Sequence, residues 1–561
     1  MKKIIARNAV ISALFALLVG ALGYYLTLPP LNVQAKGFWI FLTVVIAAFT
    51  VPFSIMNAAS GVSRDAIPLT RGKKGIARVR LPLWAVIVTL APVVVLIVGG
   101  IVSSTLFNAK AYAGIVTVED AVFEEDMPET DSVTNIALMD SDTAAVIGNR
   151  TLGSLASVVS QYGVAPSYTQ INYHRTPKKV ANLEYLGFFK WLGNRDSGIP
   201  GYVMVDPVRN DAEYVELSTP LRYSESGYLG DDLMRKLRFS YPTKIFDTVS
   251  FEIDEEGKPY YIVSCVKPQV AVFGALDVTE VIIFDPTDGS SEIKPVAEAP
   301  EWIDCVYNGY LACEKYDWYG LLSGGYWNSV IGNVGCKETT DDFGYIVIED
   351  DVWYFTGVTS VTADESNIGF IISNARTGEY KFYPVVGAEE YSAMGAAEGE
   401  VQEKGYNASF PSLVNISGEA TYIMVLKDAH SIVKLYALVN VENYSIVATG
   451  ATQDEVMAEY RTLLVQNGVI EPPEEEIPPE KEPQNVTVSV TDVRIVTLDG
   501  SSVLYITGED GSVYKGSLKE DETLILIQKG DRLALKVTET DHERIFNIVS
   551  WSEAPLDDGN E

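Results

Sequence analysis

Three uninterrupted apolar stretches lie near the start of this 561-residue chain, at residues 9–28, 38–56 and 83–107. None of them contains Asp, Glu, Lys, Arg or His. An α-helix needs roughly 20 apolar residues to cross the hydrocarbon core of a bilayer. The stretches therefore predict three transmembrane helices, with residues 1–107 as a membrane anchor. Because the spans hold no ionisable group, they indicate an anchor and not a transport path.

Basic residues flank these spans unevenly. The segment before the first span carries Lys2, Lys3 and Arg7. The connector between the second and third spans carries six more: Arg64, Arg71, Lys73, Lys74, Arg78 and Arg80. Lys and Arg next to a span resist translocation, so both segments are expected in the cytoplasm. The loop at 29–37 and everything after residue 107 are then expected outside, which predicts a multi-pass protein of the cell membrane with an extracytoplasmic C-terminal body.

The first apolar stretch also has a second interpretation. Val33-Gln34-Ala35 resembles a small-residue processing site that follows an apolar run, as in a cleaved signal peptide. The run is longer than a signal core usually is, which favours a retained helix. Cleavage would leave two spans and the same external body.

The body is strongly acidic. Residues 1–107 hold ten of the 42 Lys and Arg residues and one of the 75 Asp and Glu residues, which leaves 32 basic and 74 acidic residues, a net of −42, in the remainder. Such a field repels nucleic acid at long range, so no nucleic-acid partner is expected. An acidic surface also keeps a protein dispersed without any partner.

Two small basic clusters interrupt the acidic body. Arg235, Lys236 and Arg238 form one, and Arg175 with residues 178–179 forms the other. Internal salt bridges to the abundant Asp and Glu residues explain them most simply. Phospholipid headgroups or an acidic partner are the alternatives.

Four cysteines all fall in the body: Cys265, Cys305, Cys313 and Cys336. An oxidising compartment permits one or two disulfides among them, and free buried thiols are equally compatible with the sequence. No Cys-x-x-Cys pair occurs, so neither a zinc ribbon nor a thioredoxin-type site is expected.

Alternating apolar residues and Gly/Asp turns predict a series of β-hairpins. The hairpins are expected at 251–263, 281–295, 368–383 and 421–441. Helical patterns at 299–307, 388–404 and 452–466 follow three of them. Antiparallel sheets that are each covered by a helix predict an α+β architecture for the body.

Residues 388–450 resemble a known family. A helix of small residues, among them Ala393 and Ala397, ends at Gly405-Tyr406 and leads to Gly418-x-x-x-Tyr422-x-x-x-Leu426-x-Asp428 and a second strand. This arrangement resembles the PepSY module, a helix plus hairpin found in exported bacterial proteins, and the two preceding hairpins resemble looser copies. The resemblance implies binding, inhibition or chaperoning of a partner, and no catalysis. Residues 440–444 replace the family's usual Asp-x-x-Thr-Gly ending, which 285–289 supplies in an earlier copy.

The C-terminal part is set apart by a tract of Pro and Glu at 469–484, which is expected to be an extended linker. Residues 485–553 then show about six short strands punctuated by Asp-Gly and Gly-Asp pairs. This punctuation predicts a small β-barrel of the OB or SH3-like kind. The barrel lacks a basic aromatic face, so a structural or partner-binding role is favoured.

Signals for catalysis are weak throughout the chain. Only His174, His430 and His542 offer an imidazole, and neither Gly-x-Ser-x-Gly nor His-Glu-x-x-His occurs. The chain is therefore expected not to be an enzyme and to need no metal or cofactor. The alternative is a glycan hydrolase of the envelope, because such an enzyme needs only two carboxylates at a suitable separation.

An aromatic-rich segment supplies the only candidate ligand contacts. Aromatic rings stack on sugar faces when exposed and form core when buried, and core is favoured here. The candidates are Trp302, Trp318, Tyr319, Tyr326 and Trp327.

These patterns predict an anchor at 1–107, an α+β region of no recognised type at 108–240, PepSY-like repeats at 241–468, the linker and the barrel. The predicted function is that of a membrane-anchored binding or scaffold protein of the bacterial cell envelope. Its expected partner is another envelope protein or a wall polymer.

Overall fold

The computed structural model describes residues 1–60, 81–130, 138–340, 342–348, 350–361, 363–471, 483–498, 501–519, 521–540, 542 and 544–554. The chain divides into two units, Met1–Ile470 and Glu471–Glu561. The basic connector at 61–80 and residues 472–482 of the Pro/Glu tract lie outside the described residues.

Three long apolar helices form the N-terminal end of the first unit, as predicted, and each is long and apolar enough to cross a membrane. They are α1 (Lys2–Thr27), α2 (Lys36–Ala59) and α3 (Leu83–Val102). Helix α2 packs against both α1 and α3. Asn8 Nδ2 donates a 2.8 Å hydrogen bond to Asn57 Oδ1, and the hydroxyls of Thr50 and Thr89 lie 2.7 Å apart. Polar contacts of this kind hold helices together where lipid offers no hydrophobic driving force.

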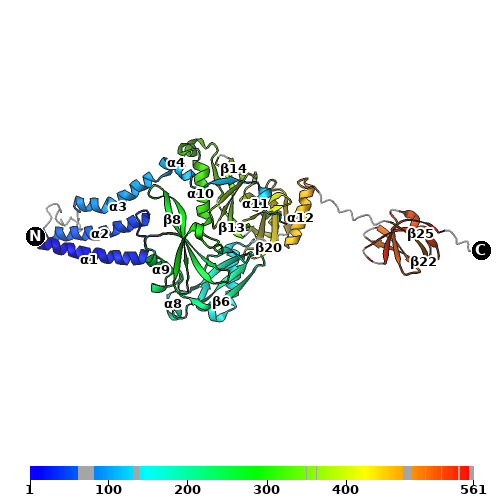
Figure 1. The fold of residues 1–561 in the computed structure, drawn as a ribbon, viewed down its shortest axis with the longest axis horizontal. Helices are drawn as coiled ribbons and strands as arrows, with labels where there is room; N and C mark the ends of the chain where they lie inside the picture. Colours follow the sequence, from blue (N-terminus) through cyan, green and yellow to red (C-terminus); the bar gives the residue numbers. More distant parts are fainter. Residues whose placement is uncertain are drawn as a thin grey trace, which may run out of the picture. The chain divides into compact units, whose positions relative to one another are not determined.

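The third apolar stretch is not one helix to residue 107, as the sequence predicted. Helix α3 ends at Val102, and α4 (Thr105–Ala113) follows in another direction (Figure 1). The break has a cause in the body, because Ser103 Oγ accepts the backbone N–H groups of Val272 and Phe273, both at 3.0 Å. The Ser103 carbonyl accepts the hydroxyl of Tyr112 at 2.6 Å. The body thus determines where the span stops.

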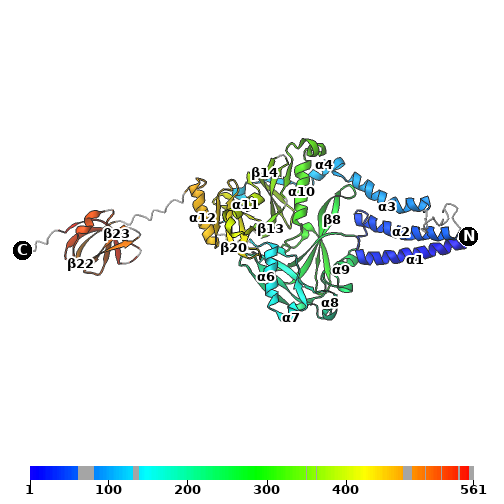
Figure 2. The same ribbon diagram turned by 180° about the vertical axis from the view of Figure 1, so that it is seen from behind.

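The loop between α1 and α2 contacts the same body. Arg238 Nε donates to the carbonyl of Leu28 at 2.9 Å, and the Leu31 N–H donates to the carbonyl of Pro242 at 2.7 Å. The end of α1, the start of α2 and the end of α3 therefore lie at one end of the bundle, where the body begins (Figure 2).

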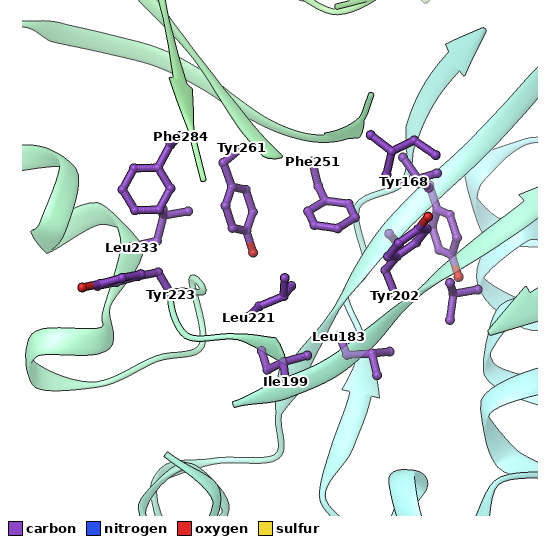
Figure 3. Close-up of a cluster of buried hydrophobic side chains, with 14 of the residues drawn as sticks. Tyr168, Leu183, Ile199, Tyr202, Leu221, Tyr223, Leu233, Phe251, Tyr261 and Phe284 are labelled. Atoms are coloured by element: carbon purple, nitrogen blue, oxygen red, sulfur yellow. The ribbon is translucent and has the colours of Figure 1, made fainter. Parts of the chain in front are cut away.

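Two antiparallel sheets form the first layer pair of the body. The first contains β2 (Tyr162–Val164), β3 (Thr169–Tyr173), β4 (Thr176–Tyr185), β5 (Ile199–Asp206) and β6 (Asp211–Leu221). The second contains β7 (Ile245–Ile253), β8 (Pro259–Val270), β9 (Gly274–Phe284) and β10 (Ser291–Pro295). Their facing side chains share one core, in which Tyr202 of the first sheet lies near Phe251 of the second (Figure 3). Helices border this pair: α6 (Ser141–Gly153), α7 (Ala156–Val159), α8 (Phe188–Asn194) and α9 (Leu233–Ser240).

Two further sheets complete the first unit. One contains β1 (Val118–Asp120), β11 (Lys337–Thr339), β12 (Gly344–Ile348), β13 (Asp351–Ser360), β14 (Ala363–Asn374), β15 (Tyr380–Tyr383) and β16 (Gly387–Ala388). The other contains β17 (Asn407–Ala408), β18 (Ser412–Ile416), β19 (Glu419–Lys427), β20 (Val433–Asn440) and β21 (Val447–Gly450). Helix α11 (Glu390–Glu400) shares a core with both sheets, while α10 (Gly309–Leu322) covers the outer face of one and α12 (Gln453–Gln466) that of the other.

The four predicted hairpins are confirmed as β7–β8, β9–β10, β14–β15 and β19–β20. The helix predicted at 452–466 is confirmed, and Thr452 and Glu455 form its capping box. The helix predicted at 388–404 is confirmed as α11, which ends earlier, at Glu400.

The helix predicted at 299–307 is wrong. The backbone N–H groups of Val306 and Tyr307 donate to the carbonyl of Ala375, and that of Asp304 donates to Glu252. Distant acceptors therefore bind the donors that a helix would need. The helix begins instead at Gly309, where the Asn308 side chain caps it.

The second unit contains the small closed barrel that the sequence predicted, with five strands among its described residues. They are β22 (Gln484–Leu498), β23 (Ser501–Gly508), β24 (Val513–Ser517), β25 (Arg532–Glu539) and β26 (Ile545–Glu553), and the barrel closes in the order β22-β23-β24-β26-β25. Strand β22 pairs with β25 through its first half and with β23 through its second, across a register shift between Val490 and Asp492. One long bent strand thus joins both halves of the barrel.

Removing the hydroxyl of Ser103 tests how the body is joined to the bundle. In Ser103→Ala, two backbone N–H groups of the turn between β8 and β9 lose their acceptor, which is expected to cost about 1–3 kcal/mol. Thermal unfolding of the full chain in detergent should show a lower Tm. Ser104→Ala is the control, since the exposed Ser104 hydroxyl bonds only locally to Ile101. Equal Tm values for the two variants would contradict this role for Ser103.

Candidate functional site

A groove of about 580 Å³ lies between the first sheet of the body and the edges of two others. One wall is the β3–β4 turn together with the end of β5 and the residues after it. The opposite wall is formed by strands β12 and β18, and residues 127–130 close one end. The lining residues that carry the argument below are Arg175, Lys178, Asp206, Arg209, Tyr345, Ile348, Ser412 and Asn415.

Strands β12 and β18 present their edges to this groove. Residues 345–348 and 412–415 line it consecutively. Side chains alternate between the two faces of a sheet, so four successive residues of a strand can border one space only along the strand edge. Within the described part of the chain, β12 pairs with β13 alone and β18 is hydrogen-bonded as a ladder to β19 alone. Such an edge offers free backbone donors and acceptors to another extended chain.

The chain itself already uses part of the β18 edge. The Thr130 N–H donates to the carbonyl of Asn415 at 2.8 Å, and Glu129 forms an isolated parallel bridge with Asn415. The Asn415 side chain in turn donates to the carbonyl of Met127 at 3.0 Å. An extended segment therefore fits against this edge in parallel orientation.

The described lining of the groove carries three cations and one carboxylate, and two of the cations pair with that carboxylate. Lys178 Nζ lies 2.6 Å from Asp206 Oδ2, and Arg209 Nε lies 3.9 Å from the same atom. Burial alone would raise the pKa of Asp206, but the hydrogen bond from Lys178 and backbone N–H donors outweigh it and lower that pKa. Arg175 is exposed and has no ion-pair partner among the described residues. The groove is thus locally basic within an acidic body.

Arg175 is held in a strained turn. His174 has φ of 52° and Arg175 has φ of 57°, and these two residues alone join β3 to β4. Two-residue hairpin turns of this handedness favour Asn and Gly, which tolerate positive φ. A basic residue at this position therefore costs stability, and such strain is found where a side chain has a task.

A buried polar cluster fixes the β3 side of the groove. Asp304 Oδ2 accepts the backbone N–H of Asn172 in β3 at 2.7 Å. Glu252 in turn accepts the backbone N–H groups of Asp304 at 2.8 Å and Cys305 at 3.2 Å. Burial raises the pKa of Glu252 to about 7 despite these donors, and it raises that of Asp304 as well. The cluster links β3 to β7 through hydrogen bonds to backbone groups, which is a structural use of both acids.

Lys179 lies behind the same wall. Burial lowers its pKa to about 8, and its Nζ lies 5.1 Å from the ring centre of Tyr345 in β12. This cation–π contact joins the first sheet to the strand across the groove.

The five aromatic residues proposed as ligand contacts do not line the groove. Trp302 packs against Tyr260 at 5.1 Å between ring centres, and Trp318 packs edge-to-face against Tyr112, also at 5.1 Å. The other three lie along α10 and the turn after it: Tyr319, which contacts Tyr316, and the neighbouring pair Tyr326 and Trp327. Of the five, Trp327 has the only side chain that is mostly exposed, at 67%.

The histidines and cysteines are scattered. His174 lies 3.2 Å from Glu255 in an exposed pair, while His430 and His542 are exposed elsewhere. All four cysteines are free, and burial raises the pKa of Cys265 and of Cys313 to about 12. Within the described residues, no three His, Cys, Asp or Glu side chains come together as a metal-binding group.

Sequence reasoning found one feature of this groove and missed the rest. Arg175 and Lys178 stood out as basic residues in an acidic body, and both line the groove. The strand edges gave no signal, because the first residues of β12 and β18, Gly344 and Ser412, are 68 residues apart in sequence, and only the topology brings the two strands together.

Comparisons with known proteins add little to this geometry. No protein-family model matches the chain, and no curated protein matches it. Among solved structures, a B. megaterium levansucrase mutant has a TM-score of 0.17 at 8% identity and covers 80% of this chain and 97% of its own. An acylaminoacyl peptidase of Pyrococcus horikoshii has a TM-score of 0.15 at 9% identity and covers 62% of this chain and 58% of its own. Likenesses this weak show no fold, and nothing in the comparisons points to an enzyme.

A glycine at position 175 should relieve the strain in the β3–β4 turn and so raise the stability of the protein. Arg175→Gly should raise the free energy of unfolding by about 1 kcal/mol, because glycine adopts positive φ without a steric cost. Arg209→Gly is the control, since Arg209 has no positive φ and glycine there only adds freedom to the unfolded chain. Denaturant melts of both variants provide the measurement. A less stable Arg175→Gly would show that the turn is not strained.

The buried acid predicts a pH dependence of stability. The pKa of Glu252 is raised from 4.5 to about 7, so its contribution to stability is complete below about 4.5 and is lost as the pH rises through 7. The loss is on the order of 3 kcal/mol for a shift of this size. Glu252→Gln should flatten the change in Tm between pH 5 and pH 8. The control is Glu442→Gln, because Glu442 is exposed. If Tm changes with pH in the same way in both variants, Glu252 is not the source of the pH dependence.

Proposed function

We propose that this chain is a multi-pass protein of the bacterial cell membrane whose extracytoplasmic body binds an extended segment of another envelope protein in the groove. The bound segment adds to the free edge of β12 or β18 and directs an acidic side chain to Arg175 and Arg209. The observation that carries the proposal is the parallel pairing of residues 129–130 with Asn415, which places extended backbone on one of these edges.

The proposed orientation has two supports. The N-terminal segment and the 61–80 connector are rich in Lys and Arg, which favours the cytoplasm for both. The loop between α1 and α2 and the end of α3 contact the body, through Leu28, Leu31 and Ser103. A body on the side opposite to the basic connector satisfies both facts.

A binding role also agrees with the PepSY resemblance of residues 388–450. The segment contains a helix, α11, and the hairpin β19–β20, which are the elements that the resemblance implies. Strand β18, whose edge borders the groove, lies within the same segment. We therefore infer that this module contributes to partner binding.

The alternative of a glycan hydrolase receives no support from the groove. Such an enzyme needs a pair of carboxylates that flank the substrate. Among the described lining residues, Asp206 alone carries a carboxylate, where two are needed. That carboxylate forms an ion pair with Lys178 Nζ at 2.6 Å. A wall polymer as the ligand would be favoured by several exposed aromatic rings for its sugars to stack on, and Tyr345 is the only ring in that described lining.

Peptide binding to the full chain in detergent tests this proposal. The probes are eight-residue fluorescent peptides of alternating Val and Thr, one carrying two Glu residues and one carrying two Lys residues at the same positions. The acidic peptide should bind more tightly by fluorescence anisotropy, and Arg175→Glu with Arg209→Glu should weaken it about tenfold, which corresponds to 1.4 kcal/mol.

Lys404→Glu provides the control for net charge, because Lys404 is exposed and does not line the groove. It should leave the affinity for the acidic peptide within a factor of about two at ordinary ionic strength. Equal affinities for the two peptides, or equal losses in the groove and control variants, would contradict the proposal.

A further inference from the structure

Two apolar patches on the body lie beside the ends of the membrane helices. The first, the α8–α9 patch, comprises exposed side chains just before α8, on α8, on the turn before α9 and at the end of α9: Leu186, Phe189, Leu192, Leu229 and Phe239. The second, the 327–334 patch, comprises Trp327, Val330, Ile331 and Val334. Phe189 is 83% exposed and Val334 is 79% exposed, which is costly for side chains of this kind in water.

Side-chain contacts connect the α8–α9 patch to the end of α1. The ring of Phe239 lies 5.7 Å from that of Tyr24, edge to face. Arg235 places its guanidinium 4.3 Å from the ring centre of Tyr25 and donates to the carbonyl of Leu229 at 2.7 Å. Tyr24 and Tyr25 belong to the last two turns of α1, where aromatic residues lie at the headgroup layer. Phe239 and Leu229, at one end of the patch, are therefore one side chain away from that layer.

The 327–334 patch is connected to α3 in the same way. Helix α4 follows α3 after two residues, and its Phe107 is 66% exposed. Tyr112 of α4 packs against Trp318 of α10, and Tyr326 belongs to the same cluster. Trp327 is the residue after Tyr326, and its side chain is 67% exposed to solvent, outside that cluster. The cluster of Tyr112, Trp318 and Tyr326 therefore connects this patch to α4, which follows α3.

The two patches flank the bundle on the side where it meets the body. Figures 1 and 2 both show α4 and α9 at the end of the body from which α1, α2 and α3 extend, with α8 next to α9. Lipid headgroups and the upper acyl chains occupy the space around the ends of membrane helices, and interfacial segments insert their apolar face by roughly 5–10 Å there.

We propose that both patches insert into the leaflet that borders the body, in the same bilayer that holds α1–α3, so that the body rests on the membrane through lipid contacts as well as through its helices. The contact is with acyl chains and the zwitterionic headgroup boundary. Attraction to anionic lipid is not needed, because Arg235 is paired with Asp232 and the body as a whole is acidic.

Quenching of tryptophan fluorescence by brominated acyl chains tests the proposal. The full chain is reconstituted in phosphatidylcholine vesicles with and without brominated chains. The difference between wild type and Trp327→Phe reports Trp327, and the difference between Phe189→Trp and wild type reports position 189. Each difference signal should be quenched by roughly half, as expected for rings at the acyl boundary.

Two matched controls set the baseline. Trp302→Phe reports a ring packed against Tyr260, and Tyr444→Trp places a ring at an exposed turn after β20. Neither difference signal should be quenched. The proposal is overturned if Trp327 and position 189 are quenched no more than position 444. Emission that is blue-shifted but not quenched would also overturn it, because it would place these rings against protein, such as a second copy of the chain, and not in lipid.

Discussion

Backbone polar groups at the boundary between bundle and body are the constraint on which the rest of this structure depends. A helix that leaves a membrane exposes carbonyl and N–H groups that must find partners. The body and the helix ends supply such partners to each other: Arg238 donates to the Leu28 carbonyl at the end of α1, and Ser103 Oγ, just after α3, accepts two N–H groups from the turn between β8 and β9. The second sheet of the body is therefore fixed directly to the bundle. The first sheet packs on its inner face, so the position of the groove follows from the same contacts.

The groove combines three features that would each be unremarkable alone. Free strand edges occur in many sheets, but natural proteins usually block or cover them. Here the edges of β12 and β18 face a wall that carries Arg175, Lys178 and Arg209 in a body with a large excess of acid. The turn that presents Arg175 holds two residues at positive φ, which lowers the stability of the protein. An open edge, a local cation cluster and a strained turn at one place favour recognition of an extended acidic segment.

Local patterns carried most of what the sequence could predict. The three apolar helices, the four hairpins and α12 with its capping box follow from composition, periodicity and turn chemistry within a few residues. Predictions failed where distant partners intervene. The segment 299–307 has helical periodicity, yet Glu252 and Ala375 bind its backbone donors. The span predicted to reach residue 107 stops at Val102, because the body binds Ser103.

The candidate site was harder to predict for the same reason. Arg175 and Lys178 were visible as basic residues, but nothing local indicates that Asn415 and Tyr345 lie across from them. The aromatic segment gave a strong signal of composition, and the structure uses most of it for packing, with Trp327 as the exposed exception. Composition shows which side chains are present, and only the topology decides which of them share a surface.

The orientation of the chain in the membrane is the claim on which this account rests most heavily. Labelling with a membrane-impermeant maleimide in intact cells tests it most directly, using Tyr444→Cys on the body and Lys73→Cys in the basic connector. The native thiols contribute little background, since Cys265 and Cys336 are buried and burial raises the pKa of Cys305 and of Cys313. The account predicts that Tyr444→Cys is labelled in intact cells and Lys73→Cys only after permeabilisation. The reverse pattern would contradict it.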